Sequence, residues 1–334
     1  PALTGSEYYL STPGCHRVLH RLYTDVLSQY NAFTVGETVF VTPQMADDLV
    51  NPARGELSTV FAFEHMETDC YKIKWFLRKF KPDRFFACLT KWQQQLPWNT
   101  VYLENHDQPR SVSRYGNDTK YHDESAKALA TLVLTLRGTP FLYEGQEIGM
   151  RNCAYASMDD YNDVSTHNQY NRALADGFSP EEALRLVQLE SRDNARTPFQ
   201  WDDTENAGFT TGKPWLKVNP NYTGLNAAQE ERDEDSVLAW YKKMIGLRLH
   251  SQWSELISEG TFAPAYREEK NLIAYRRRFE GKALLVLCNM QPEERELKLS
   301  AAYRQVLADN YKEAAFTGNT VRLRPYEVLI AEEA

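Results

Sequence analysis

The sequence has few cysteines, no excess of positive charge and no long apolar run. Five cysteines are spread along 334 residues without a C-x-x-C pair: Cys15, Cys70, Cys88, Cys153 and Cys288. We therefore expect free thiols in a reducing compartment. The net charge of −8 comes without a basic stripe, which argues against a nucleic-acid surface. No apolar run approaches the about 18 residues of a membrane span, and no signal-peptide pattern is present, so we expect a cytoplasmic protein that does not bind membranes.

The chain nevertheless has enough apolar residues for a sizeable core. It is 42% hydrophobic and 25% charged, which at this length predicts two domains. Up to about residue 250, short β-prone runs alternate with stretches of helical periodicity. Strands are expected at residues 33–37, 58–64, 100–104 and 139–143, and helices at 16–30, 84–96, 123–137 and 235–250. This alternation predicts parallel βα units.

Local signals predict where some of these elements end. Asp123 is expected to cap one helix at its start, and Gly138 to lie where the same helix ends. Turn-forming residues predict loops at 1–14 and between the first two strands, at about 38–57.

A long insertion is expected at about residues 150–234, where the alternation weakens. Within it, Ser179 and Glu182 have the spacing of a capping box, with Pro180 at the first helical position. This pattern predicts a helix that reaches about residue 192.

The period of the sequence changes near residue 261, where apolar residues begin to alternate or to cluster in short runs. The turn at Glu280 and Gly281 joins the first two runs as a hairpin. We expect a small antiparallel β-domain and place the boundary near residues 251–260, which divides the chain into 1–251 and 252–334.

Three of the four expected parallel strands run out into acids. Glu37, Asp107 and Glu144 follow the strands at 33–37, 100–104 and 139–143. An α/β barrel places its catalytic carboxylates at the carboxyl ends of its strands. Each acid alone has an ordinary explanation, because a Glu after Gly is usually solvated and a His-Asp pair often stabilises a turn.

Four motifs in register make the ordinary explanation inadequate. They are TVGE at 34–37, NHDQPR at 105–110, GTPFLY at 138–143 followed by QEIGM at 146–150, and SRDNARTPFQW at 191–201. In order and spacing they resemble the α-amylase superfamily, glycoside hydrolase family 13, in its branch of oligo-1,6-glucosidases, dextran glucosidases and trehalose-6-phosphate hydrolases. One departure is that Glu144 and Gln146 exchange acid and amide relative to the Gln-Gly-Glu order common in that branch.

The resemblance implies an α/β fold of which this chain is the C-terminal part. The four strands match strands five to eight of a (β/α)₈ TIM barrel, and an all-β C-terminal domain follows them. Strands one to four would then lie upstream of Pro1, together with the aspartate that acts as nucleophile. We accordingly expect this chain alone to be inactive, and to pair with the missing N-terminal half or with itself.

The resemblance also implies roles for four residues. Glu37 matches the general acid/base, whose pKa burial and a neighbouring carboxylate would raise, and Asp107 matches the third family acid. His106 and Arg192 match residues that bind the same sugar ring. Arg196, Gln200 and Trp201 are expected to brace the insertion instead of touching sugar, and no metal or cofactor is expected.

The predicted function is retaining hydrolysis of short α-glucosides such as isomalto- or malto-oligosaccharides. Sucrose and trehalose 6-phosphate remain possible substrates, although Val39, two residues past the acid, cannot bond to a phosphate, which slightly disfavours the phosphorylated sugar. The alternative is a non-catalytic protein: a truncated relic, or a sugar-binding subunit that keeps the sites without the nucleophile. Retention of both Glu37 and Asp107 favours the enzyme, because sugar binding alone requires no proton donor.

Overall fold

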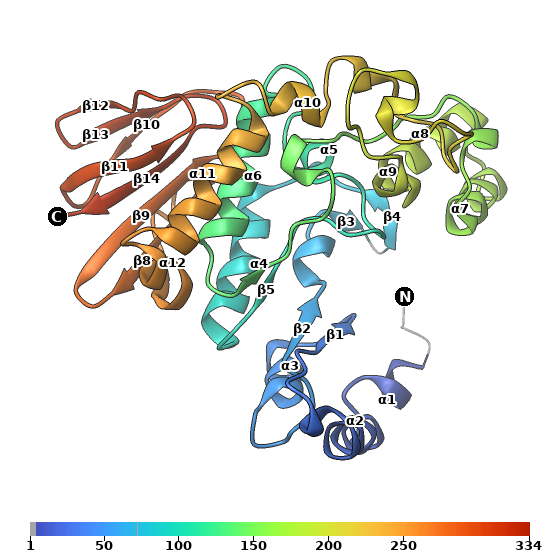
Figure 1. Cartoon of the computed structure of the whole chain (residues 1–334), viewed down its shortest axis with the longest axis horizontal. Coiled ribbons are helices and arrows are strands. Elements are labelled where there is room, and N and C mark those ends of the chain that lie inside the picture. The colour runs from blue at the N-terminus through green and yellow to red at the C-terminus, as the bar shows by residue number, and fades with distance from the viewer. Residues whose placement is uncertain (1–4, 72) are drawn as a thin grey trace.

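A computed structural model describes residues 5–71 and 73–334 of the chain (Figure 1). It opens with α1 (Ser6–Tyr9), α2 (Pro13–Asp25) and the 3₁₀ helix η1 (Leu27–Gln29). A loop was expected at residues 1–14. This prediction is wrong for residues 6–9 and 13–14, which are helical, and residues 1–4 lie outside the described part of the chain. Helix α2 begins earlier than expected because the Thr12 hydroxyl accepts a hydrogen bond from the Cys15 amide, with Pro13 at the first helical position.

Four short parallel strands follow, each near its expected position. Strand β1 (Val35–Thr38) pairs in parallel with β2 (Thr59–Ala62), and β5 (Thr100–Val101) pairs in parallel with β6 (Thr139–Pro140). Side chains join the two pairs, since the hydroxyl of Thr100 donates to the carbonyl of Val60 and that of Tyr102 to the carbonyl of Ala62. Tyr102 lies two residues after Thr100, and Ala62 lies two residues after Val60, so β5 runs in the same direction as β2.

A helix follows each of these strands. They are α3 (Pro43–Val50), α4 (Pro82–Gln95), α6 (His122–Thr135) and, after the insertion, α11 (Val237–His250). The loop expected at 38–57 is thus partly wrong. Thr42 caps α3 through the Met45 amide, and Pro43 begins the helix instead of breaking it. Its buried Ala46 and Leu49 pack toward β2 and α4.

The expected ends of α6 are also wrong. The helix begins at His122 after Tyr121, and the Asp123 carboxylate contacts the His122 ring at 2.6 Å instead of capping the backbone. The helix ends at Thr135, before Gly138. Gly138 has a φ of 131°, and a Cβ there would lie 2.1 Å from the carbonyl oxygen of Asn99. The glycine is therefore required by the close approach of two backbones.

A β-hairpin and several short helices were not expected. The hairpin consists of β3 (Cys70–Tyr71) and β4 (Ile73–Leu77). The short helices outside the insertion include α5 (Ser111–Tyr115), η2 (Glu64–Glu67) and η3 (Gln146–Ile148).

The insertion is mostly helical. Its elements are η4 (Met158–Asp160), α7 (Val164–Ala175), α8 (Pro180–Glu190), α9 (Asp193–Arg196), η5 (Glu205–Gly208), η6 (Pro220–Thr223) and α10 (Ala227–Glu230). The expected capping box at Ser179 and Glu182 is confirmed, with both reciprocal hydrogen bonds present. Figure 1 shows α7, α8 and α9 at the opposite end of the molecule from the C-terminal strands.

The C-terminal part is an antiparallel β-structure preceded by α12 (Ser254–Glu259). Its strands are β7 (Thr261–Pro264), β8 (Leu272–Phe279), β9 (Lys282–Asn289), β10 (Arg295–Lys298), β11 (Tyr303–Asp309), β12 (Ala315–Thr317), β13 (Thr320–Leu323) and β14 (Val328–Glu333). They form a five-stranded sheet, β11-β14-β9-β8-β7, and a three-stranded sheet, β10-β13-β12. The expected hairpin turn is confirmed: Glu280 and Gly281 both have positive φ, at 47° and 77°.

The large sheet packs on α4, α6 and α11 in one continuous core. Two buried arginines fasten the C-terminal end of α6. Arg248 of α11 donates to the carbonyls of Leu134, Leu136 and Gly138, and Arg277 of β8 donates to the Thr135 carbonyl at 2.6 Å. These guanidinium groups satisfy carbonyls that a helix end leaves without partners. They hold α6, and with it the start of β6, against the C-terminal sheet.

Candidate active site

The candidate active site lies at the carboxyl ends of the four parallel strands. Phe61 of β2 is the central residue of this edge, since its ring centroid lies 5.0 Å from that of Tyr102 and 4.7 Å from that of Phe141. Tyr102 and Phe141 directly follow β5 and β6. Glu37 of β1 pairs in register with Phe61. The aromatic contacts therefore connect the ends of β2, β5 and β6, and the strand pairing adds the end of β1.

Glu37 lies on the exposed side of this edge. Its side chain is exposed to solvent in the chain as it stands, so the expectation that it is buried is wrong here. It is close enough to the buried Tyr102 to affect that group: burial chiefly, with the charges of Tyr115 and then Glu37 adding to it, raises the pKa of Tyr102. The acid is thus at the expected strand end but lacks the enclosed environment that would favour its protonated form.

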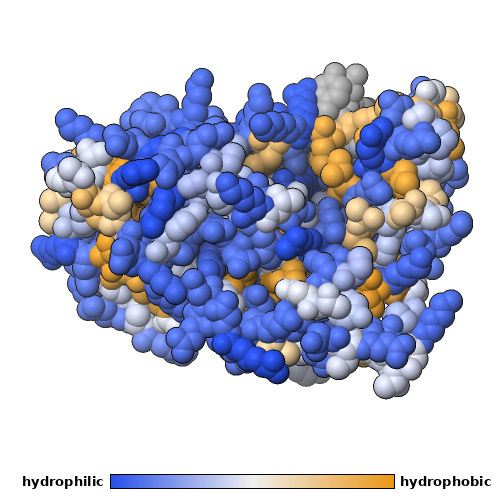
Figure 2. Space-filling view, turned by 90° about the horizontal axis from the view of Figure 1, so that it is seen from above, coloured by the Kyte–Doolittle hydropathy of each residue, from blue (hydrophilic) through white to orange (hydrophobic). Residues whose placement is uncertain are grey.

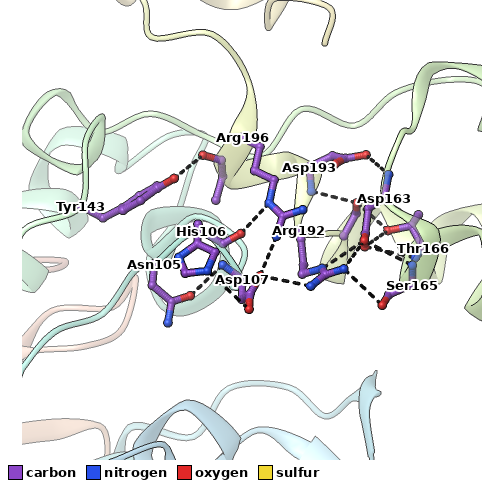
Figure 3. Close-up of polar contacts among 12 residues, drawn as sticks. Asn105, His106, Asp107, Tyr143, Asp163, Ser165, Thr166, Arg192, Asp193 and Arg196 are labelled. Carbon is purple, nitrogen blue, oxygen red and sulfur yellow. Dashed lines mark hydrogen bonds and ion pairs between the residues drawn. The ribbon is translucent and has the colours of Figure 1, made fainter. Parts of the chain in front are cut away.

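Asp107 is held in a loop after β5 by contacts from three directions (Figure 3). Its backbone amide donates to the side-chain oxygen of Asn105 at 2.8 Å, which forms a tight turn. Its carboxylate accepts hydrogen bonds from Arg192 at 3.3 Å and from Arg196 at 2.6 Å. The His106 ring nitrogen Nε2 lies 3.7 Å from the other carboxylate oxygen, and the ring is largely exposed. An exposed imidazole beside a fixed carboxylate can bind hydroxyl groups of a sugar.

Arg192 connects Asp107 to the insertion. Its Nε and Nη2 donate to Asp163 Oδ1 at 3.0 and 2.5 Å, while its Nη1 reaches Asp107. The hydrogen bond that Arg192 donates to Asp163 is the main cause that raises the pKa of Arg192. Burial opposes ionisation of Asp163, but the hydrogen bond from Arg192 and that from the Thr166 hydroxyl lower the pKa of this carboxyl. Both groups are therefore charged at neutral pH.

Asp163 is itself fixed by its place in the chain. It is the N-cap residue of α7, where its carboxylate accepts hydrogen bonds from the amides of Ser165 and Thr166. Its own amide donates to the buried Asp193 carboxylate at 2.9 Å, one residue after Arg192. A helix start and an adjacent carboxylate thus orient the arginine that reaches the site.

Arg196 was expected to brace the insertion, and its contacts tie the insertion to the loop that carries Asp107. It donates to Asp107 and also, through Nε, to the backbone carbonyl of His106 at 2.9 Å. The spacing could have revealed this contact, because Arg196 follows Arg192 by four residues and one helical turn places both on the same face of α9. Gln200, by contrast, binds the Leu225 carbonyl within the insertion, as expected.

Arg110, at the end of the NHDQPR motif, joins the loops around the site. Its fully buried guanidinium lies 3.2 Å from Glu104 and donates to the backbone carbonyls of Glu144, Asn194 and Ala195. One side chain therefore ties the segments after β5 and β6 to α9. Sequence reasoning placed Arg110 in the motif but gave it no role.

The exchange of acid and amide after β6 has a visible consequence. Glu144 is exposed and Gln146 is buried. The neighbouring Glu147 carboxylate accepts a hydrogen bond from the Gly145 amide at 2.7 Å. Burial raises the pKa of Glu147. Because Glu104 and Glu147 already bring two carboxylates to this region, an amide at 146 avoids burying a third.

Across residues 5–71 and 73–334, no helix is both long and apolar enough to cross a bilayer. Nor do those residues contain three His, Cys, Asp or Glu side chains grouped as a metal site requires.

Parallel strands that are each followed by a helix, with acidic side chains at their carboxyl ends, define part of an α/β-barrel protein. Residues 2–257 match the alpha-amylase catalytic domain, and residues 272–330 match the alpha-amylase SusG C-terminal domain. The chain belongs to the α-amylase family, with an α-amylase-type TIM-barrel fold and a C-terminal antiparallel all-β domain. The resemblance stated from the four motifs is thereby confirmed.

Named relatives lie in the expected branch. Oligo-1,6-glucosidase of Parageobacillus thermoglucosidasius is 40% identical over 98% of this chain and 59% of the relative. Trehalose-6-phosphate hydrolase of Bacillus subtilis is 36% identical over 98% of this chain and 59% of the relative. Among solved structures, Bacillus licheniformis trehalose-6-phosphate hydrolase superposes with a TM-score of 0.93 at 35% identity, covering 99% of this chain and 61% of that one. The chain thus spans about 60% of the length of the relatives it matches.

Proposed function

We propose that this chain is the C-terminal part of a retaining α-glucosidase that hydrolyses short α-glucosides, such as isomalto- or malto-oligosaccharides. In this proposal residues 1–251 supply strands five to eight of the barrel and residues 252–334 the C-terminal domain. One observation carries the proposal: Asp107, beside the exposed His106, is fixed by Arg192 and Arg196 at the carboxyl ends of parallel strands. A carboxylate held in place beside an exposed imidazole suits the binding of sugar hydroxyl groups.

Each residue has a task in this proposal. Glu37 protonates the glycosidic oxygen as the bond breaks and then takes a proton from the attacking water. Asp107 and His106 bind hydroxyls of the sugar ring whose bond is cleaved, and Arg192 grips the same ring while orienting Asp107. Retention also requires a second carboxylate about 5–5.5 Å from the acid to attack the anomeric carbon. We assign that nucleophile to no residue of this chain.

The nucleophile is proposed to come from a complementary half-barrel. Among the described strands, β1-β2 and β5-β6 form two pairs that the Thr100 and Tyr102 hydroxyls join through β2 and β5, so β1 and β6 lie at the outer edges. Near β1, the exposed fractions of Tyr8, Val18 and Phe33 are 82%, 68% and 62%. Such apolar exposure favours a partner surface. Docking of the complementary half would also enclose Glu37 and shield it from bulk water.

For substrate preference we propose an unphosphorylated α-glucoside over trehalose 6-phosphate. Val39 follows Glu37 by two residues and offers no donor to a phosphate. Comparison of isomaltose, maltose, sucrose and trehalose 6-phosphate as substrates of the assembled enzyme tests this preference. A clear advantage for the phosphorylated sugar would overturn it.

A second candidate is a sugar-binding subunit without catalysis, which the exposure of Glu37 in the isolated chain favours. Glu37→Gln in the assembled enzyme separates the two candidates. The variant keeps the shape but loses the proton donor, so the rate on substrates with poor leaving groups should fall by about 10²–10⁴. Activated aryl glucosides should lose far less in the glycosylation step, because their leaving groups need no proton. Equal losses on both substrate types would show that Glu37 holds structure, and no hydrolysis by the unmutated assembly would favour the binding subunit.

A further inference from the structure

The insertion contains a hollow that none of the proposed catalytic residues lines. It is formed by η4 and the residues after it, by η5, and by the segment from Lys213 to Tyr222, in the region of Figure 1 that includes α7–α10. Its volume is about 650 Å³, which is within the range of small-molecule sites. Seen from above, hydrophilic residues cover most of the molecule, with hydrophobic ones gathered in separate patches (Figure 2). The hollow differs from that surface because it joins an aromatic wall to polar side chains.

Trp215 forms the apolar wall of the hollow. The residue is 66% exposed, whereas the adjacent Leu216 is buried at 3%. The backbone is thus anchored by Leu216 while the large indole ring is left to solvent. Tyr222 adds a second, partly exposed ring. Exposed tryptophan contributes large contact area at little cost in side-chain freedom, and it is common where a ligand is bound.

The rest of the rim is polar and mildly acidic. Asp159, Asn162 and Glu205 are exposed there, and their oxygens accept hydrogen bonds. Asp160 is paired with Lys217, so these two charges offset each other. Among the other charged residues that line the hollow, Asp159 and Glu205 are acidic and Lys213 is basic, so the remaining rim has more carboxylates than cations. It therefore disfavours phosphate or carboxylate ligands and suits a neutral ligand rich in hydroxyl donors.

We propose that this hollow is a second, non-catalytic binding site for α-linked gluco-oligosaccharides. A pyranose ring has an apolar C–H face and a rim of hydroxyls, which matches one aromatic wall bordered by acceptor side chains. Trp215 stacks on the sugar face, and Asp159, Asn162 and Glu205 accept its hydroxyl hydrogens. The choice of a glucan among neutral polyhydroxy ligands rests on the proposed function.

The test is a calorimetric titration of isomaltoheptaose into the full chain carrying Asp107→Asn, which weakens binding at the candidate active site. Added Trp215→Ala should lower the remaining affinity by about tenfold or more, and Trp215→Phe should retain part of it. Glu205→Gln should weaken binding by a few fold. Because Trp215 is exposed, these variants should unfold at the same urea concentration as their parent.

Trp201→Ala is the matched control. Trp201 is also exposed, at 54%, but its ring rests on Phe199 at 4.5 Å in a different hollow. Unchanged affinity in Trp201→Ala supports the assignment. Equal affinity in Trp215→Ala, equal losses in both tryptophan variants, or no binding of isomaltoheptaose would overturn it. Binding of tetramethylammonium in place of the sugar would also overturn it, because carboxylates around an indole can hold an organic cation.

Failure of this inference is distinguishable from failure of the proposed function. The assembled enzyme with Trp215→Ala should hydrolyse a small aryl α-glucoside at the unmutated rate, because the hollow is not part of the catalytic site. If the chain binds isomaltoheptaose through Trp215 but the assembled enzyme hydrolyses nothing, the proposed function fails and the second site stands.

Discussion

Asp163 is the residue whose replacement tests most sharply how the site is oriented. In Asp163→Asn the single remaining oxygen can serve either the cap of α7 or Arg192, but not both. If this oxygen still accepts the hydrogen bonds from the Thr166 amide, now 3.1 Å, and from the Thr166 hydroxyl, now 2.9 Å, the NH₂ group of the new asparagine faces the Arg192 guanidinium. The variant should therefore keep the helix start and lose the ion pair.

The expected cost follows from the geometry of the pair. A hydrogen bond to a charged group contributes about 1.5–3 kcal/mol. Asp163 is 1% exposed, but Arg192 is 24% exposed and keeps Asp107, so solvent offsets part of the loss. We expect the free energy of unfolding to fall by about 1.5–2 kcal/mol in Asp163→Asn. Asp163→Ala should cost about 1 kcal/mol more, because it also removes the cap.

The assay is urea unfolding of the unmutated chain, Asp163→Asn, Arg192→Gln and the double variant at pH 7. The coupling energy between the two sites should be about 1.5 kcal/mol. Because the pKa of Asp163 is lowered in the folded state, its contribution is complete above its unfolded pKa and is lost as the pH falls through its folded pKa. The coupling should thus be equal at pH 7 and pH 5. Additive losses at pH 7 would refute the view that Asp163 holds Arg192 by charge.

Two further predictions concern other groups. Arg196→Gln removes the 2.6 Å hydrogen bond to Asp107. In the assembled enzyme kcat should then fall by about tenfold, which corresponds to about 1.4 kcal/mol in activation free energy, and KM should change less. An unchanged kcat would limit Arg196 to a bracing role. His65 is buried, which lowers its pKa to about 4, so unfolding releases it to bind protons and the free energy of unfolding should rise by up to about 3 kcal/mol from pH 4 to 6.5. Burial raises the pKa of Asp309 to about 6. The folded state therefore binds the proton more tightly, and this group makes the free energy of unfolding fall as the pH rises over much the same pH range. Each variant is unfolded in urea at pH 4.5 and 6.5. Between these pH values the free energy of unfolding should fall in His65→Gln, which keeps Asp309, and rise in Asp309→Asn, which keeps His65. The same change with pH in both variants would contradict the lowered pKa of His65 and the raised pKa of Asp309.

The parallel strands and five of the helices, α2, α4, α6, α8 and α11, could be predicted because each is encoded by local pattern. The helix at 84–96 has its apolar residues on one face, and the capping box at Ser179 and Glu182 satisfies itself within four residues. The hairpin at Glu280 and Gly281 likewise depends on two adjacent positive φ angles. None of these features needs information from distant parts of the chain.

The errors arose where one residue type has opposite meanings in different contexts. Pro43 was taken as a loop former, yet after a capping Thr42 a proline begins a helix. Asp123 was taken as a cap, yet its carboxylate is occupied by the neighbouring His122 ring. Only the tertiary neighbourhood decides between these uses.

The candidate site shows the same division. Glu37, His106, Asp107 and Arg192 could be selected from motifs, because each motif is contiguous. The contact of Arg196 with Asp107 joins residues 89 apart and depends on how the insertion folds back over β5. Whether Glu37 is enclosed depends on which surfaces cover it, and a motif does not contain that information.

The most direct measurement of the central claim is a reconstitution assay. The purified chain is mixed with a separately expressed complementary N-terminal half-barrel, and release of glucose from isomaltose and an aryl α-glucoside is measured for each part and for the mixture. The account predicts no hydrolysis by this chain alone, hydrolysis by the mixture, and loss of that activity on isomaltose in Glu37→Gln. A well-folded monomer of this chain that cleaves an α-glucoside by itself would contradict it.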